Sequence, residues 1–276
     1  AGALVGLAES GLIQNVRITN VDIEGGNKVG AVAGQITTNP ETLAAMTIRN
    51  ASAVGGTVSG ADDIGGLIGT ADPSHGGSIL IEKVYTDLEV TGEDSLGGLI
   101  GRLHSIINGV SSSSNVSVVL RNAYSWSSVV APEGSYVGGL IGTVEARNEG
   151  AGSSVLQIQN TYASGEVEGN ENIAGLIGYF WVDQGSEVEF SNNFAKGSVT
   201  ASTDTPRQGG LIGELDGGAW ADIDSTGNFY DRSGTTQANC SSVNALADCV
   251  AINSDGSQES YFINNSTNAP MNSWDF

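Results

Sequence analysis

Acidic side chains that could bind a metal ion or transfer protons precede a recurring glycine-rich stretch of this chain. Asp62 and Asp63 stand just before one copy of the stretch, and Glu93 and Asp94 stand just before the next. In stacked copies these carboxylates would lie along one edge about 5 Å apart, where like charges repel. Calcium accepts carboxylate oxygens in flexible geometry and would relieve the repulsion. We therefore expect either a calcium site at these four residues or a solvated acidic ridge. Later copies carry further acids at Glu133, Glu171 and Asp204.

Sequence signatures of enzymes do not occur. The two histidines, His75 and His104, do not complete the zinc-protease pattern H-E-x-x-H, and no G-x-S-x-G elbow, P-loop or dinucleotide-binding glycine loop is found. Carboxylates on one face of a β-helix can cleave polysaccharides, often with a basic residue beside them, but bases are scarce here. The sequence predicts a non-catalytic protein, with a polysaccharide-active β-helix enzyme as an alternative.

The element that positions the acids is a stretch of the form Gly-Gly-Leu-Ile-Gly. Strong copies occupy residues 64–69, 96–101, 137–142, 173–178 and 208–213, and degenerate copies occupy 29–34 and 1–6. Successive copies begin 28 to 41 positions apart, and a repeat of 20 to 50 residues is typical of a fold that stacks one unit.

Each repeat carries two further strand signals. One is an apolar–polar–Asn run, with Asn15, Asn50, Asn122, Asn160 and Asn192 at its end and Lys83 in place of asparagine in one copy. The other is a short run such as residues 58–60, 90–92 and 167–169. Three strand signals per repeat predict a right-handed parallel β-solenoid with three short strands per coil and about seven coils.

The columns of identical residues carry two expectations about side chains. Stacked asparagines can hydrogen-bond to one another along the rod, with Lys83 as a local exception. Strict alternation along a strand cannot send both Leu67 and Ile68 inward. The glycine motif therefore requires a bulge or a covered outer face.

The repeated stretch resembles the GLUG motif of secreted and surface-attached bacterial proteins. Residues 227–231 and 274–276 are similar to the divergent segment that commonly follows such repeats. The resemblance implies an adhesin-like protein, or a region beside the protease domain of an immunoglobulin A-cleaving metallopeptidase. It implies a surface context without implying catalysis in this chain.

Charge and composition bear on partners and location. The chain has 10 Lys+Arg against 31 Asp+Glu, a net charge of −21, which repels nucleic acid and anionic lipid. No run approaches the roughly 18 apolar residues of a membrane span, and no signal peptide opens the sequence. Because residue 1 falls inside a repeat copy, we expect a piece of a longer multidomain chain. We expect it to be monomeric and to act outside the cell or at a bacterial surface.

Residues 225–276 depart from the repeat pattern, whereas residues 1–224 follow it. An end of a solenoid needs a cap that covers its last open coil, and we expect the departing segment to be that cap within the same domain, with Trp274 and Phe276 as apolar plugs. Cys240 and Cys249 predict a disulfide that pins the cap; two free thiols or half of a metal site are the alternatives.

Variable segments between the glycine motif and the next strand suggest a binding surface. They are residues 70–78, 102–115, 143–154 and 179–186, and all should emerge at one corner. Tyr179, Phe180 and Trp181 could stack on sugar rings, with Trp126 and Trp220 adding to the platform; alternatively these rings pack against the core. We expect a non-catalytic adhesion, binding or stalk module whose partner is a protein or glycan of a host or neighbouring cell. A passive spacer beside a catalytic domain is the first alternative.

Overall fold

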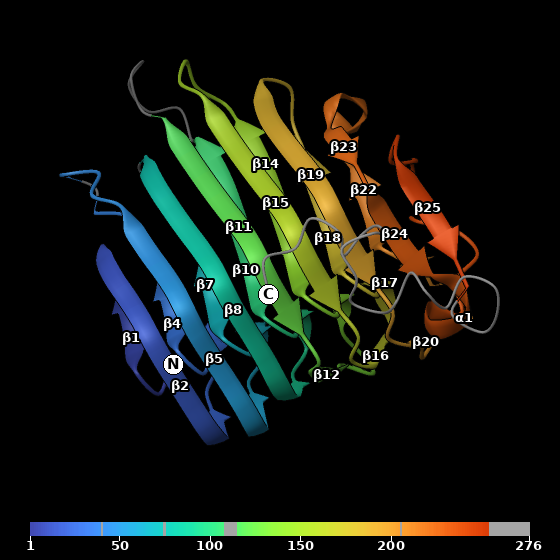
Figure 1. The fold of residues 1–276 in the computed structure, drawn as a ribbon, viewed down its shortest axis with the longest axis horizontal. Coiled ribbons are helices and arrows are strands. Elements are labelled where there is room, and N and C mark those ends of the chain that lie inside the picture. Colours follow the sequence, from blue (N-terminus) through green and yellow to red (C-terminus); the bar gives the residue numbers. More distant parts are fainter. Residues whose placement is uncertain (40, 74–75, 108–114, 205, 254–276) are drawn as a thin grey trace.

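Parallel strands stack into an elongated coil in the computed structural model, which describes residues 1–39, 41–73, 76–107, 115–204 and 206–253 (Figure 1). Each long strand pairs with its counterpart in the neighbouring repeat, as β5 (Met46–Ser59) does with β2 (Gly11–Glu24) and β8 (Gly77–Thr91). The predicted parallel β-solenoid is thereby confirmed. The described chain completes about six coils, so the predicted count of seven is approximate. The right-handed sense stays a prediction, and Trp274 and Phe276 lie outside the described residues.

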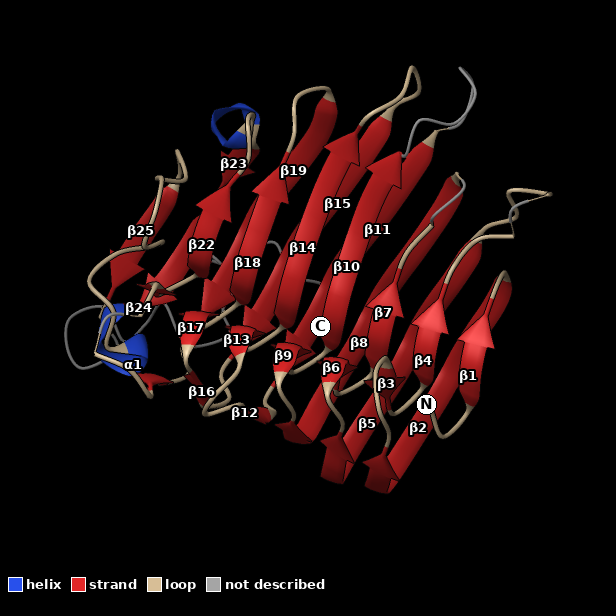
Figure 2. Cartoon of the chain, turned by 180° about the vertical axis from the view of Figure 1, so that it is seen from behind, coloured by secondary structure: helices blue, strands red, loops and turns tan. Residues whose placement is uncertain are grey.

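Three sheets line the coil in the described part of the chain. The short sheet contains β3 (Val29–Gly30), β6 (Asp62–Gly65), β9 (Asp94–Gly97), β13 (Ser135–Gly138), β17 (Glu171–Ala174) and β21 (Gln208–Gly209). The back sheet, which faces the viewer in Figure 2, contains β1 (Val5–Ala8), β4 (Ala33–Ile36), β7 (Ile68–Ala71), β10 (Ile100–Ile107), β14 (Ile141–Asn148), β18 (Ile177–Val182) and β22 (Ile212–Asp216). The front sheet contains β2 (Gly11–Glu24), β5 (Met46–Ser59), β8 (Gly77–Thr91), β11 (Val116–Ser125), β12 (Ser128–Val130), β15 (Ser154–Ala163), β16 (Val167–Gly169), β19 (Ser186–Ala195), β20 (Val199–Ala201), β23 (Asp224–Thr226), β24 (Asn228–Asp231) and β25 (Cys249–Ile252).

The glycine motif forms a corner between the short and back sheets. In its second strong copy β9 ends at Gly97 and β10 begins at Ile100, with Leu99 in the bend between them. A bend, unlike a straight strand, can send two successive side chains inward. Leu67 and Ile68 of the first strong copy are accordingly both fully buried. The corner, and not a bulge, therefore explains how Leu67 and Ile68 can both point inward.

The division of each coil into strands differs from the prediction. The glycine motif supplies strands to two sheets. The run at residues 58–60, predicted as a third strand, instead begins with the last residues of β5, and the run at 90–92 begins with the last residues of β8. Three sheets were predicted correctly. The predicted run at 167–169 does form a strand of its own, β16, but this strand belongs to the front sheet.

The last glycine of the motif allows two coils to approach closely. A Cβ added to Gly101 would lie 2.4 Å from the carbonyl carbon of Asp63 and 2.5 Å from the nitrogen of Ile64, both in β6 of the preceding coil. Backbone atoms cannot move away as a side-chain end can. Glycine at this position is therefore a packing requirement.

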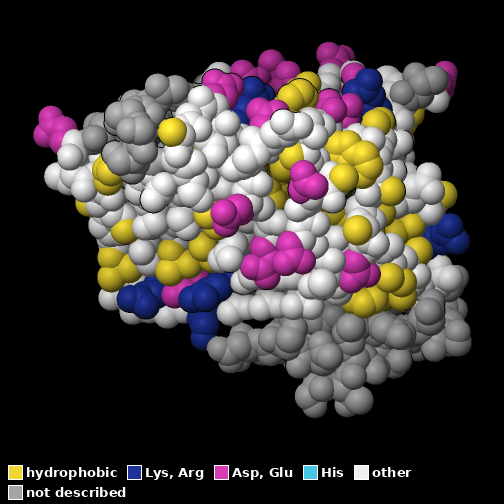
Figure 3. Space-filling model, turned by 90° about the horizontal axis from the view of Figure 1, so that it is seen from above, with side chains coloured by type: hydrophobic (Ala, Val, Ile, Leu, Met, Phe, Trp, Pro, Cys, Tyr) yellow, Lys and Arg dark blue, Asp and Glu magenta, His cyan; other side chains and the backbone are white. Residues whose placement is uncertain are grey.

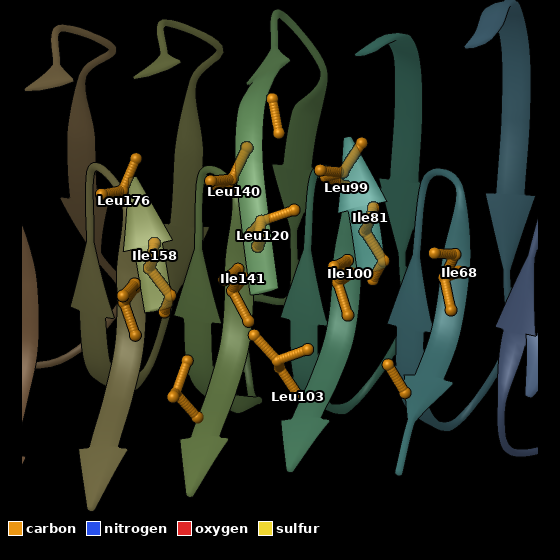
Figure 4. Close-up of a cluster of buried hydrophobic side chains, with 14 of the residues drawn as sticks. Ile68, Ile81, Leu99, Ile100, Leu103, Leu120, Leu140, Ile141, Ile158 and Leu176 are labelled. Atoms are coloured by element: carbon orange, nitrogen blue, oxygen red, sulfur yellow. The ribbon is translucent and has the colours of Figure 1, made fainter. Parts of the chain in front are cut away.

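The core between the sheets is a stack of aliphatic layers. Leu99, Leu140 and Leu176 lie at successive corners, opposite Ile81, Leu120 and Ile158 of the front sheet (Figure 4). All six side chains are fully buried. Repetition of the same side chain in each coil lets every layer pack on an identical one, which explains the regular motif.

The asparagine column marks a left-handed kink in each long front strand. Asn15, Asn50, Lys83, Asn122, Asn160 and Asn192 have φ between 49° and 57°. Asparagine tolerates this conformation better than most residues. The amide of Asn50 donates to Asn15 at 3.1 Å and that of Asn160 donates to Asn122 at 3.2 Å, which confirms the predicted amide pairing in these coils. Lys83 interrupts the column, as expected.

A second, internal column of polar side chains was not predicted. The hydroxyl of Thr161 donates to Asn193 Oδ1 at 2.7 Å, and Asn193 Nδ2 donates to Asn228 Oδ1 at 3.0 Å. Asn228 in turn donates to the carbonyl of Phe190 at 2.8 Å. Thr161, Asn193 and Asn228 are fully buried. Buried amides are stable here because their partners lie in the adjacent coils.

The cap adds a partial coil to the rod. Its described part, residues 225–253, contains α1 (Arg232–Thr235) and β25, which extends the front sheet beyond β24, and η1 (Trp220–Asp222) precedes it. The predicted disulfide between Cys240 and Cys249 is present and joins the segment after α1 to the start of β25. No helix of the described residues is long and apolar enough to cross a membrane.

Candidate binding face on the back sheet

Outward side chains of the back sheet form two columns along the rod. They are the first and third residues after the last glycine of each motif. The register places Thr70, Arg102, Thr143, Tyr179 and Glu214 in the first column. The same register places His104, Glu145, Trp181 and Asp216 in the second, and Asp72 stands at the equivalent position of the preceding repeat. Inward residues such as Leu103 and Val144 anchor these strands in the core.

An aromatic patch, defined as Tyr136, Tyr179 and Trp181, occupies part of this face. The ring centroids of Tyr136 and Tyr179 are 5.1 Å apart, and those of Tyr179 and Trp181 are 6.3 Å apart. The Arg147 guanidinium carbon lies 5.2 Å from the Trp181 ring centroid, within cation–π range, and Trp181 Nε1 donates to Asp183 at 2.8 Å. All three rings are half-buried, so they present fixed surfaces to solvent.

An ionic cluster borders the patch. His104 Nδ1 lies 3.8 Å from Asp72 Oδ2, and His104 Nε2 lies 3.5 Å from Glu145 Oε1. The second oxygen of Glu145 pairs with Arg147 at 2.7 Å. Burial alone would lower the pKa of His104, but Asp72 and Glu145 outweigh it and raise that pKa above its usual value. For Glu145 burial would raise the pKa, yet His104 and Arg147 hold it below its usual value.

The surroundings of Tyr179 are apolar and acidic together. Burial, followed by the nearby carboxylates of Asp216 and Glu214, raises the pKa of the Tyr179 hydroxyl far above its ordinary value. The phenol therefore stays protonated and can donate a hydrogen bond at any physiological pH. Aromatic faces beside hydrogen-bonding groups are the usual means by which proteins hold ligands with both apolar and hydroxyl surfaces.

The acids predicted to bind calcium are separated by the structure into two settings. Asp63 turns toward the back sheet, where its Oδ1 lies 3.0 Å from Arg102 Nε; burial raises its pKa in spite of this partner. Asp62 pairs in register with Asp94, accepts a hydrogen bond from Asn27 at 2.9 Å, and lies at the outer edge. Asp94 accepts from the backbone N–H of Ser135 at 2.7 Å.

Within the described ranges no group of three or more acidic, histidine or cysteine side chains is arranged to hold a metal ion. Calcium at Asp62, Asp63, Glu93 and Asp94 stays a prediction, and Arg102 already pairs with Asp63.

The three predicted ligand-binding aromatics do not share one face of the sheet. Tyr179 and Trp181 lie on the outer face, but Phe180 is fully buried and packs edge-on against Phe190 with a centroid distance of 5.9 Å. The prediction is wrong for Phe180 because residues 177–182 form strand β18, not a loop, and alternate residues of a strand face opposite sides. Of the two tryptophans expected to join the platform, Trp126 lies on the front sheet and Trp220 in η1.

Sequence reasoning missed His104, Glu145, Arg147 and Tyr136 as members of this face. A signal was present, since His104, Glu145 and Trp181 share one offset from their motif glycine. This shared offset indicates a shared face only if the residues after the motif form a strand. Because these segments were predicted to be loops, the pattern was not recognised.

The ionic cluster is better suited to structure than to proton transfer. Both imidazole nitrogens of His104 face carboxylates, which favours the protonated ring, whereas a general base must be deprotonated near its working pH. Basic and acidic groups do lie together on this face, which is the arrangement expected of a polysaccharide-active β-helix. Figure 3 shows acidic side chains spread widely over the adjoining face, with few basic ones.

Comparisons with known proteins give partial matches. No family model matches the chain, and no solved structure matches it. Halomucin of Haloquadratum walsbyi is 32% identical over 222 residues, which cover 74% of this chain and 2% of halomucin. The immunoglobulin A1 protease of Streptococcus sanguinis is 29% identical over 179 residues, covering 63% of this chain and 8% of the protease. The chain thus corresponds to a small part of each of these relatives.

Proposed function

We propose that this solenoid is a non-catalytic binding module of a secreted or cell-surface protein, and that it holds a surface glycan or glycoprotein through the aromatic patch. The observation that carries the proposal is the set of rings Tyr136, Tyr179 and Trp181, held half-exposed on a rigid sheet with Arg147 over Trp181. Such fixed rings lose little entropy on binding a sugar ring.

The matches to known proteins support the location. Halomucin and the immunoglobulin A1 protease are both secreted or surface proteins. An extracellular setting also suits a chain whose two cysteines form a disulfide. The resemblance to GLUG repeats belongs to the same proposal, and so does an adhesive role in a bacterial protein.

Two other functions remain as alternatives with observations of their own. The match within an immunoglobulin A1 protease fits a spacer beside a catalytic domain. The cluster of His104, Asp72 and Glu145 beside Arg102 and Arg147 fits a polysaccharide-active enzyme.

One set of assays separates the three functions. The purified chain is applied to immobilised neutral oligosaccharides and a mucin glycoprotein, and is incubated with the same glycans in solution to detect new reducing ends. We expect saturable binding without cleavage. Cleavage that His104→Asn abolishes would establish the enzyme instead, and neither binding nor cleavage across the panel would leave the spacer.

A further inference from the structure

A ladder of aromatic rings on the front sheet ends at Tyr85, which lines a groove. The rings belong to one column of residues that pair in register from strand to strand along the rod. The members of this column are Arg17, Ser52, Tyr85, Tyr124, Tyr162, Phe194 and Phe229. Tyr85 and Tyr124 are stacked with centroids 5.1 Å apart and planes 7° apart. Tyr162 and Phe194 repeat this geometry at 5.3 Å and 11°. The aromatic column therefore has the spacing of the coils themselves.

Ser52 occupies the position where the next ring would stand. Its side chain is small and buried, so no ring stands beyond Tyr85 in this column. A groove of about 420 Å³ lies there, lined by Ser52, Tyr85 and Tyr124 together with Asn50, Asn122 and other residues. Because adjacent strands are about 4.8 Å apart, the missing rung is the thickness of one ring.

The charge of the groove is opposite to that of the protein. Arg17 and Lys83 line it, and none of the described lining residues is acidic. The whole chain has only 10 Lys+Arg and a net charge of −21. The Arg17 guanidinium, with no acidic side chain among the described lining residues, favours an anionic ligand, since a carboxylate pairs well with arginine.

The remaining wall supplies hydrogen-bonding groups. Asn15 and Asn50 contribute amides, whose positions are fixed by their own contact at 3.1 Å and by the left-handed backbone at both residues. Amides donate and accept, and so they match hydroxyl groups. A ligand that fills the missing rung thus needs a flat apolar face, hydroxyls at its edge and a negative charge.

We infer that this groove binds the acidic sugar of a polyuronate or similar glycan, with one hexuronate ring stacked on Tyr85 above Ser52. The carboxylate of that ring pairs with Arg17, and its hydroxyls meet the asparagine amides. The site lies on the front sheet, on the other side of the coil from the aromatic patch, and does not depend on it.

Titration calorimetry with galacturonic acid oligomers tests the inference, with uncharged galactose oligomers of equal length for comparison. We expect the acidic oligomer to bind at least tenfold more tightly. Ser52→Tyr, which completes the ladder, should weaken binding tenfold or more. Tyr85→Leu should do the same, and it serves as the second variant if Ser52→Tyr fails to fold by circular dichroism.

Arg17→Gln tests the charge, because glutamine keeps a hydrogen-bonding side chain at this position of the groove without the positive charge. It should weaken the acidic oligomer several-fold and reduce the salt dependence of binding. Arg232→Gln, at the exposed start of α1 beyond the groove, is the matched control and should leave uronate binding unchanged. Equal affinity for neutral and acidic oligomers, undiminished binding by Ser52→Tyr, or no binding at millimolar uronate would overturn the inference. Tighter binding of a tyrosine-rich peptide, lost in Ser52→Tyr, would overturn the choice of a sugar.

Discussion

The carbonyl oxygen of Cys240 accepts the backbone hydrogen bond of Leu211 at 3.0 Å and also that of Ile212 at 2.9 Å. Within the regular coils a corner leucine plays this part: the carbonyl of Leu99 accepts from Leu67 and Ile68. Cys240 thus stands where the next corner leucine would stand. The cap thereby supplies to the last glycine motif the hydrogen-bond acceptor that a further copy of the motif would supply.

Removal of the disulfide should loosen the corner at Cys240. Replacing both Cys240 and Cys249 by alanine opens a loop of about ten residues, and chain entropy predicts a loss of about 2–3 kcal/mol. We expect faster hydrogen exchange at the amides of Leu211 and Ile212, measured by mass spectrometry. Amides near Leu67, several coils away, provide the internal control. Uniform acceleration along the chain would contradict a local role for the disulfide.

Gly101→Ala should be among the most damaging single-methyl changes in the chain. The new Cβ would meet the Asp63 carbonyl carbon at 2.4 Å, so the two coils must separate, at a cost of about 2–3 kcal/mol. Gly6→Ala is the matched control, since a Cβ there meets nothing within 4 Å and should change stability by less than about 0.5 kcal/mol. Thermal melting of both variants checks the contrast, and equal melting temperatures would refute it.

Asn193→Ala should destabilise the rod more than its outer counterpart Asn50→Ala. Loss of the buried amide leaves the Thr161 hydroxyl without its partner and removes one of the two hydrogen bonds to Asn228 Oδ1, and a buried unsatisfied group costs about 1–3 kcal/mol. The exposed Asn50 amide has water as an alternative partner, so its loss should cost about 1 kcal/mol, mainly from the left-handed backbone. Urea unfolding measures both. A larger effect for Asn50→Ala would contradict the account of the internal column.

Stability should depend on pH through His104. Its pKa is raised in the folded chain, so its contribution is complete below the unfolded value of about 6.5 and is lost as pH rises through the folded pKa. Glu145, whose pKa is lowered, stays ionised at pH 5.5. His104→Asn should therefore cost about 1–2 kcal/mol at pH 5.5 and clearly less at pH 9, by urea unfolding. The same loss at both pH values would show that only packing was removed.

The fold could be predicted from the sequence because every repeat places the same types of residue at the same positions. Leucine and isoleucine at fixed offsets identify the core layers, and asparagine identifies the kink in each front strand. Spacing between motifs could not show that Gly66 and Leu67 form a corner, because a bend and a bulge leave the same pattern of apolar residues. The sequence also did not show where each strand ends, which is why Phe180 was assigned to a surface loop.

The binding face was predictable only in part. Trp181 stood out as an aromatic residue in a variable segment, and it does lie on the outer surface of β18. Tyr136 reaches Tyr179 from a different strand, 43 positions earlier, and such a contact follows from the stacking of coils and not from local sequence. Likewise, Arg102 pairs with Asp63 of the adjacent coil, so the acidic ridge is less uniform than the sequence suggests.

The most direct test of the central claim is isothermal titration of the chain, and of Trp181→Ala, with the neutral oligosaccharide that binds best in the panel. Trp126→Ala, on the front sheet, is the matched control. Binding through the aromatic patch predicts about tenfold weaker affinity for Trp181→Ala, or about 1.4 kcal/mol, with Trp126→Ala within twofold of the unaltered chain. Equal affinity for Trp181→Ala and the unaltered chain would contradict the assignment of the back sheet as the binding face.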